Sequence, residues 1–352
     1  MNECKQSIAE RTIASFCRKC LGNYVFQLGR TWKHLPASVR NSSFGLSYGR
    51  HIHRMVCLYS DRNQYVSTYF LRNRPELELM CRLLKTKDRG SRVQISVLGC
   101  SKGAEIYSLV WRIRCARPDL NLSVNGVDIS EEMVAFAEEG TYSAAGADAS
   151  NVNSNTDATE NGYVGKNTRK DQKTSIFERL SDREMQEMFE SKDDQLTIRS
   201  WLRRDVVWIC GDACDPDLAH SLRLQDIVVA NRFLCHMKPS VAEPCLRNIA
   251  RMVKPGGYLF VSGVDLDLRR RVAEVLGWEP VTDLIREIHE GDPSLREGWP
   301  IEYWALEPFV RDRPDWVTRY ASVFRLGMTE ASSTLRTATD APDSGRLIDS
   351  MV

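Results

Sequence analysis

The sequence of 352 residues has no apolar run long enough to cross a bilayer, which excludes a transmembrane helix from the expected architecture. A secretory signal is also missing, because the opening MNECKQSIAERT has no apolar stretch after a basic one. The sequence also lacks an excess of charge of either sign, since 48 basic and 47 acidic residues leave a formal net charge of +1. Such a chain has no global field that attracts nucleic acid or an anionic membrane. We therefore expect a cytoplasmic protein with neither of them as a partner.

The sequence also lacks a second cysteine pair with zinc-site spacing. Cys17 and Cys20 form a Cys-x-x-Cys pair, but Cys210 and Cys214 are a poor match for it. We therefore expect no metal. The scatter of the eleven cysteines instead indicates small buried side chains in a reducing compartment. The residues expected to be buried in this way are Cys57, Cys81, Cys100, Cys115, Cys210, Cys235 and Cys245.

The rest of the chain is organised around residues 93–130. The apolar residues 95–98 predict a buried strand, which ends at a glycine turn over 99–103. Apolar side chains at helical spacing then predict a helix that Pro118 closes, and residues 122–127 predict a second strand. This order is typical of the first half of a nucleotide-binding α/β sheet.

Two glycines and one acid in this segment indicate a nucleoside-type cofactor. Gly99 and Gly103 have no Cβ, so the backbone can turn sharply and approach a ligand closely. Asp128 ends the second strand about 25 residues after Gly103, where an acid can accept hydrogen bonds from ribose hydroxyls. The middle glycine of the GxGxxG pattern is missing, so the prediction depends on Asp128.

The same turn also fits the GxSxG nucleophile elbow of α/β-hydrolases, with Ser101 as the nucleophile. A hydrolase would need an acid and a histidine further along the chain. Asp226 or Asp265, followed by His289, would keep the required order. This alternative leaves Asp128 without a role.

GCSKGAEIYS, followed by VDIS, resembles the chemotaxis receptor (CheR-type) methyltransferases, which use S-adenosyl-L-methionine to esterify glutamate side chains. Three further blocks agree in order: residues 67–73 with the family's TxFFR segment, 226–237 with its D-L-I-x-C-R-N-V-L-I-Y-F segment, and 254–260 with its KPGGYLF turn. The resemblance covers residues 68–262. It implies a doubly wound, Rossmann-like class I methyltransferase sheet and the cofactor S-adenosyl-L-methionine.

The resemblance and the fold together assign roles to individual residues. Arg72 is expected to pair with the cofactor carboxylate or to steady the acceptor, Glu105 to accept from the cofactor ammonium, and Asp212 to meet the adenine amino group. Arg232 and His236 follow the strand near the transferred methyl group. The catalytic candidates are Arg72, Arg232 and His236, and the cofactor-binding candidates are Thr68, Arg72, Gly99, Cys100, Ser101, Gly103, Glu105, Asp128, Ile129, Asp212, Ala213 and Asn231.

Five positions depart from the family pattern. Asn231 and Arg232 stand in the reverse of the usual order, His236 replaces a Tyr, Val66 replaces an Asn, and Asp212 stands where the family has an Asn. These positions surround the acceptor and the adenine. The family's protein substrate is therefore not carried over with the fold.

Composition divides the chain into three parts. Residues 1–88 read as a helical domain or lid, in which Thr68 and Arg72 lie one helical turn apart and face the same side. Residues 89–310 read as the cofactor-binding domain, with a polar insert at 143–175 that is expected to be disordered. Residues 291–309 are expected to form the last strand pair. Residues 311–352 read as an extension that is largely a disordered tail.

The predicted function is O-methylation of a carboxylate or hydroxyl on a small molecule. A carboxylate needs only orientation, by Arg72 and Arg232, whereas a hydroxyl needs a base, for which His236 is placed. Methylation of a protein glutamate is an alternative that follows the family. Two others are a hydrolase that uses Ser101 and a cofactor-binding protein without catalysis.

Overall fold

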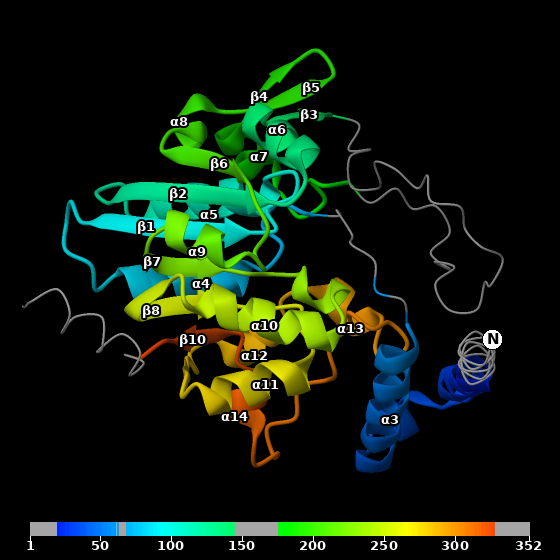
Figure 1. The fold of residues 1–352 in the computed structure, drawn as a ribbon. Coiled ribbons are helices and arrows are strands. Elements are labelled where there is room, and N and C mark those ends of the chain that lie inside the picture. Colours follow the sequence, from blue (N-terminus) through cyan, green and yellow to red (C-terminus); the bar gives the residue numbers. More distant parts are fainter. Residues whose placement is uncertain (1–19, 61, 63–67, 145–174, 328–352) are drawn as a thin grey trace, which may run out of the picture.

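The computed structural model describes residues 20–60, 62, 68–144 and 175–327. Its centre is a seven-stranded sheet with the strand order β6-β2-β1-β7-β8-β10-β9 (Figure 1). The first five strands in this order are parallel, and β10 is antiparallel to both β8 and β9. The strand bounds are β1 Arg92–Leu98, β2 Asn121–Asp128, β6 Val206–Cys210, β7 Gln225–Val229, β8 Val253–Phe260, β9 Glu279–Pro280 and β10 Val323–Arg325. The predicted doubly wound, Rossmann-like α/β sheet is confirmed.

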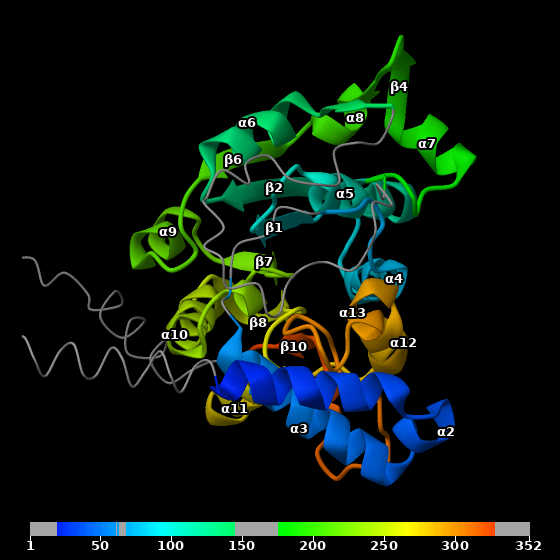
Figure 2. The same cartoon turned by 90° about the vertical axis from the view of Figure 1, so that its right-hand side faces the viewer.

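Helices cover both faces of the sheet (Figures 1 and 2). The apolar side chains of β1 alternate between the two layers, because successive residues of a strand point to opposite faces. Val97 packs in the same core as α4 and α5, whereas Leu98 packs with α10 and α11. The helices around the sheet are α4 Arg74–Leu84, α5 Ala104–Ala116, α6 Glu131–Glu139, α9 Pro216–Ser221, α10 Pro239–Ala250, α11 Leu266–Val275, α12 Ile285–Glu290, α13 Pro293–Glu297 and α14 Trp316–Tyr320.

A second, three-stranded antiparallel sheet lies beyond the β6 edge (Figure 1). Its order is β3-β5-β4, with β3 Thr141–Ser143, β4 Phe189–Lys192 and β5 Gln195–Ile198. Helix α7, Asp182–Met188, directly precedes β4 and begins with a capping box between Ser181 and Glu184. Helix α8, Ser200–Arg203, leads back to the main sheet.

The N-terminal part is helical, as predicted. A helix runs from residue 20, where the described part begins, to residue 34, and is followed by α2 Ala37–Arg40 and α3 Ser43–Tyr59. Val25, Trp32, Ile52 and Val56 form a small core between these helices. Trp299, Ile301 and Tyr303 pack against this core and tie it to the C-terminal part of the chain.

The structure corrects the expected helical turn between Thr68 and Arg72. Residues 70–73 form a turn in which Leu71 has a φ of 48°, which no α-helix contains. Helix α4 begins only at Arg74, because the Asn73 side chain caps it by accepting from the Glu76 N–H.

Two expectations about the sheet are also wrong. Strand β6 was expected to be buried, but it forms an edge of the sheet, and Val207 is 54% exposed. Residues 291–309 form helix α13 and turns instead of the last strand pair, and that pair is β9 with β10. The sheet therefore continues past residue 310 to Arg325.

The cysteine prediction holds in part. Cys81, Cys100, Cys235 and Cys245 are buried, whereas Cys57 is half-buried and both Cys115 and Cys210 are exposed. Cys115 lies in the last turn of α5, and Cys210 lies on the edge strand.

Several predictions concern residues outside the described part, namely Cys17, Val66, almost all of the 143–175 insert, and the tail from residue 328. Among the helices that the structure describes, none combines the length and the apolar character of a membrane span. The division at residue 88 stays a prediction.

Candidate active site

The glycine turn lies against the end of β2. Gly99 and Gly103 both have positive φ angles, of 67° and 81°, which glycine adopts at no steric cost. The Ser101 N–H donates to Asp128 Oδ2 (2.7 Å), and the Ser130 N–H donates to Asp128 Oδ1 (3.0 Å). An ionised carboxylate has about four acceptor positions, so Asp128 can still accept from a ligand.

Strand β6 brings the predicted adenine residues next to Asp128. The Gly211 N–H donates to the Asp128 carbonyl (2.9 Å), so Asp212 and Ala213 follow directly beside the end of β2. Asp212 Oδ1 accepts from the Cys214 N–H (2.8 Å). Asn248 Nδ2 donates to the Ala213 carbonyl (2.9 Å). Ile129 directly follows β2, and its apolar side chain is exposed to solvent.

Thr68 and Cys100 are among the cofactor candidates that are buried. The Cys100 N–H donates to the Val127 carbonyl, which extends the β1–β2 ladder into the turn. Burial raises the pKa of the Cys100 thiol, so the thiol stays neutral. The side chain is therefore suited to packing beneath the turn.

Asn231, which follows β7, joins two glutamates. Its Nδ2 donates to Glu105 Oε1 (2.7 Å) and to Glu76 Oε1 (2.6 Å), and its Oδ1 accepts from both the N–H and the hydroxyl of Ser262. Burial raises the pKa of Glu105, and it raises the pKa of Glu76 to about 8 with a further contribution from Glu105. Asn231 and Glu105 are site residues predicted from the sequence, whereas Glu76 is not.

Arg72 and Arg232 belong to a half-buried cluster of arginines around the buried Asp292. Arg179 Nη2 lies 2.9 Å from Asp292 Oδ1, and Arg232 Nη1 lies 3.6 Å from Asp292 Oδ2. Arg179 also donates to the Arg72 carbonyl (2.6 Å). Burial, and then the charge of Arg232, lowers the pKa of Arg72 to about 10, so this arginine stays protonated at neutral pH. Arg179 and Asp292 carried no signal in the sequence.

His236 ends a short 3-10 helix, η2 Leu234–His236, and its Nδ1 lies 2.8 Å from the Tyr303 hydroxyl. Burial, followed by the charges of Arg232, Arg62 and Arg72, lowers the pKa of His236 to about 4. The imidazole is therefore neutral at physiological pH. Tyr303 is not among the site residues predicted from the sequence.

Arg62 ties the N-terminal part to this region. Its guanidinium donates to both carboxylate oxygens of Asp265 (3.1 and 2.9 Å) and to the carbonyls of Cys235 and Met237 on either side of His236. It also lies over the Tyr303 ring, 5.7 Å from the centroid. Arg62 itself is thereby held beside His236.

The structure does not assemble the hydrolase residues. Asp226 accepts from Lys87 Nζ and from the Gln94 N–H near the start of β1, so it lies at the opposite end of the sheet from Ser101. Asp265 is paired with Arg62. His289 Nε2 lies 2.8 Å from the Glu307 carbonyl and is buried. The GxSxG alternative therefore has no catalytic triad.

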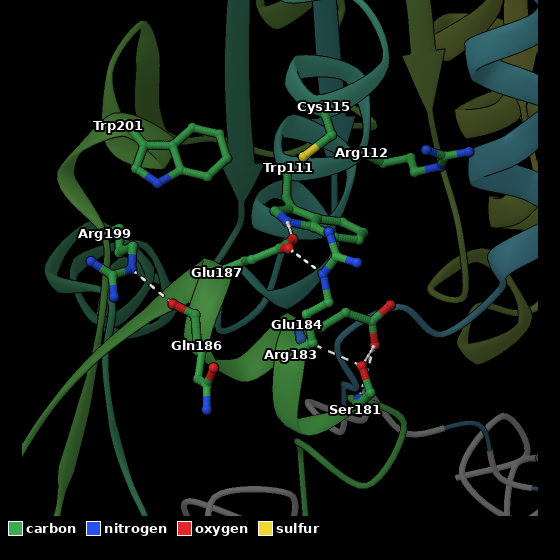
Figure 3. A pocket seen from close by; sticks show the side chains of 10 residues that line it. All are labelled: Trp111, Arg112, Cys115, Ser181, Arg183, Glu184, Gln186, Glu187, Arg199 and Trp201. Atoms are coloured by element: carbon green, nitrogen blue, oxygen red, sulfur yellow. Dashed lines mark hydrogen bonds and ion pairs between the residues drawn. The ribbon is translucent and has the colours of Figure 1, made fainter.

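A separate surface pocket lies along α5 and α7 (Figure 3). Residues from the later turns of α5 line this pocket, whereas Glu105 of the candidate site lies in the first turn of that helix. Its charges are largely paired, as Glu187 accepts from Arg183 Nε and from Trp111 Nε1. We assign it no cofactor role. The pocket is lined by Trp111, Arg112, Cys115, Ser181, Arg183, Glu184, Gln186, Glu187, Arg199 and Trp201.

Two family models match the chain. Residues 66–174 match the SAM-binding domain of the CheR methyltransferases, a stretch that includes Thr68, Glu105 and Asp128. Residues 182–261 match a general methyltransferase domain, a stretch that includes Asn231 and His236. No curated protein matches the chain.

Solved structures with some similarity include magnesium protoporphyrin IX methyltransferase from Synechocystis PCC 6803 with bound SAM, at 15% identity over 58% of this chain and 69% of that chain, with a TM-score of 0.30. The [4+2]-cyclase SpnF is 13% identical over 81% of this chain and 97% of its own, with a TM-score of 0.34. The CMeT domain of the citrinin polyketide synthase is 14% identical over 53% of this chain, with a TM-score of 0.30, and the match spans 33% of that synthase chain.

Proposed function

The chain is a CheR-like, S-adenosylmethionine-dependent methyltransferase, and we propose that it methylates a carboxylate oxygen of a small molecule. The observation that carries this proposal is the positive charge around His236. Arg62 donates to the carbonyls of Cys235 and Met237 on either side of this imidazole. After burial, the charges of Arg232, Arg62 and Arg72 contribute most to the lowered pKa of His236. An anionic acceptor would be stabilised there, because buried guanidinium groups bind carboxylates strongly.

The donor set suits the cofactor. We propose that Asp128 accepts from the ribose hydroxyls, that Asp212 meets the adenine, and that Arg72 pairs with the carboxylate of the methionine part. Glu105 would accept from its ammonium group. A second buried acid, Glu76, has an oxygen, Oε2, without a hydrogen-bond partner among the described residues. Cationic groups of the cofactor would fit between such acids.

The bound cofactor supplies a methyl group on a positively charged sulfur, which leaves as a neutral thioether. The chain itself must align the acceptor and exclude water. In the proposed site, Arg232 orients the acceptor carboxylate, which is already ionised and needs no base. His236, with a pKa of about 4, is too weak a base to deprotonate a hydroxyl efficiently. It is better suited to hold the acceptor through hydrogen bonding, with Tyr303 fixing Nδ1.

The surroundings of His236 favour a small acceptor. Tyr303 and Trp304 contact each other edge to face beside it, and Trp299 packs against the N-terminal helices. Tyr303 packs against the same helices, so we propose that these helices and Arg62 cover this side of the site. A protein glutamate remains the second candidate acceptor, because residues 66–174 match the CheR domain. Both candidates present a carboxylate, so they differ in size and not in the acceptor atom.

The full chain should be incubated with S-adenosylmethionine labelled in the methyl group and a panel of small carboxylic acids, the matching alcohols, and glutamate-containing peptides. We expect label on small acids that mild alkali releases as methanol, because only methyl esters are cleaved under these conditions. Replacement of the central arginine, Arg232→Gln, should reduce the label strongly. Arg251→Gln, on an exposed arginine after α10, is the control. Alkali-stable label, or label on peptides alone, would contradict the proposal.

A further inference from the structure

Glu76 is an acidic residue on the buried side of helix α4, where an apolar side chain is usual. It lies in the first turn of α4 and is only 5% exposed. Its Oε1 accepts from Asn231 Nδ2, but its Oε2 is buried with no hydrogen-bond partner in the part of the chain that the structure describes. Acidic side chains are rarely buried to this extent without a cationic partner, and an unmet buried oxygen costs free energy.

Glu76 faces Glu105 across a single amide. Asn231 Nδ2 carries two hydrogens, and each is used by one of the two glutamates. Asn231 cannot rotate to relieve the crowding, because its Oδ1 is held by the backbone and the hydroxyl of Ser262. Two buried carboxyl groups placed side by side cannot both be ionised at low cost unless a cation joins them.

We propose that Glu76 and Glu105 together form the receptor for the positively charged part of the cofactor, and that Glu76 releases its proton to solvent when the cofactor binds. The O–H bond of the Glu76 carboxylic acid breaks, and the resulting carboxylate faces the incoming positive charge. Glu76 is thus a cofactor-binding residue that shares the Asn231 amide with Glu105. The inference rests on the cofactor part of the proposed function and not on the acceptor.

The charges around Glu76 agree with this assignment. Without a ligand, burial and then Glu105 raise the pKa of Glu76 to about 8, and Asp292 contributes in the same direction. Arg72 acts in the opposite direction, and Arg269 of α11 also lies within electrostatic reach. Glu76 is therefore mostly protonated at pH 7. Bound S-adenosylmethionine adds one net positive charge, which favours the ionised form.

Calorimetric titration of the full chain with S-adenosylmethionine, in phosphate and in Tris at pH 7, measures the protons released on binding. We expect about half to one proton from the wild type, and fewer with S-adenosylhomocysteine, which lacks the sulfonium charge. From pH 6 to pH 8, the affinity of the wild type for S-adenosylmethionine should rise about tenfold more than that of Glu76→Gln. The glutamine keeps an oxygen that accepts from Asn231, but it has no proton to release. The ligand's own amino group titrates equally with both proteins, so the comparison removes its contribution.

Glu78→Gln is the matched control, because Glu78 lies on the same helix and pairs with Arg82 and Arg112. It should release as many protons as the wild type. Equal proton release by the wild type and by Glu76→Gln would overturn the inference. If Glu76→Gln fails to fold, the wild type alone decides: a binding enthalpy that is the same in phosphate and in Tris would overturn the inference. Failure of the wild type to bind the cofactor would overturn the cofactor site itself, which is a different outcome from binding without proton release.

Discussion

His236 owes its chemical state to neighbours from distant parts of the sequence. Tyr303 meets its Nδ1, and burial followed by the charges of Arg232, Arg62 and Arg72 lowers its pKa to about 4. The neutral imidazole leaves the positive charge of the arginines in place at physiological pH. Asp265 already pairs with Arg62, whereas Arg179 and Arg232 share the single charge of Asp292. An acceptor carboxylate would balance the positive charge that remains, which is why a carboxylate is the proposed acceptor.

We expect Tyr303→Phe to slow methyl transfer about tenfold while the affinity for S-adenosylmethionine stays unchanged. The substitution removes the hydroxyl that fixes His236, so the imidazole samples unproductive orientations. Turnover rates and calorimetric binding measure the two effects separately. Tyr24→Phe is the control, because Tyr24 makes an equivalent bond to His51 (2.9 Å) at the surface. Equal rates for both variants, or loss of cofactor binding in Tyr303→Phe, would count against this role of Tyr303.

The residues of the candidate site differ in how far the sequence could predict them. Asp128 and Glu105 stand at fixed positions relative to a strand end and a helix start, so a local pattern reveals them. Glu76 gives no such signal, because an acid in the first turn of a helix reads as a favourable partner of the helix dipole. Its contact is with Asn231, 155 residues further along the chain. Tyr303 meets His236 across 67 residues, and no spacing rule predicts that pair.

At the level of elements, the β1–α5–β2 unit was predictable because each part is specified by its own residues. The alternation and the helical spacing of the apolar side chains define the strands and the helix, and glycines mark the turn. The edge position of β6 and the insertion of β10 between β8 and β9 were not predictable in this way. Strand order depends on contacts between distant segments, about which the local pattern carries no information.

The turn after β1 should not tolerate a side chain at Gly99. A Cβ there would lie 2.9 Å from the Phe233 ring, and the φ of 67° adds backbone strain. We expect Gly99→Ala to reduce the free energy of unfolding by about 2–4 kcal/mol and to abolish cofactor binding. Gly90→Ala isolates the strain, because Gly90 has a φ of 76° and no atom within 4 Å of the added Cβ. Denaturant unfolding of both variants gives the comparison, and equal losses would contradict a steric role for Phe233.

On the scale of the whole molecule, the candidate site is assembled from three parts of the chain. Arg62 and Arg72 come from the connection between the N-terminal helices and α4. Asp128 and His236 follow strands of the sheet, and Tyr303 belongs to the C-terminal segment that packs against the N-terminal helices. We propose that the N-terminal helices cover the acceptor side, which would limit the site to small molecules.

The central claim is that the glycine turn and Asp128 bind S-adenosylmethionine, and calorimetric titration with S-adenosylmethionine and S-adenosylhomocysteine tests it most directly. We predict that the wild type binds both ligands and that Asp128→Asn weakens both at least tenfold, because the lost charge weakens the hydrogen bonds to the ribose hydroxyls. Asp119→Asn, at the other end of β2, pairs with Arg117 and should bind like the wild type. Absence of binding to both ligands, or unchanged affinity in Asp128→Asn, would contradict the claim.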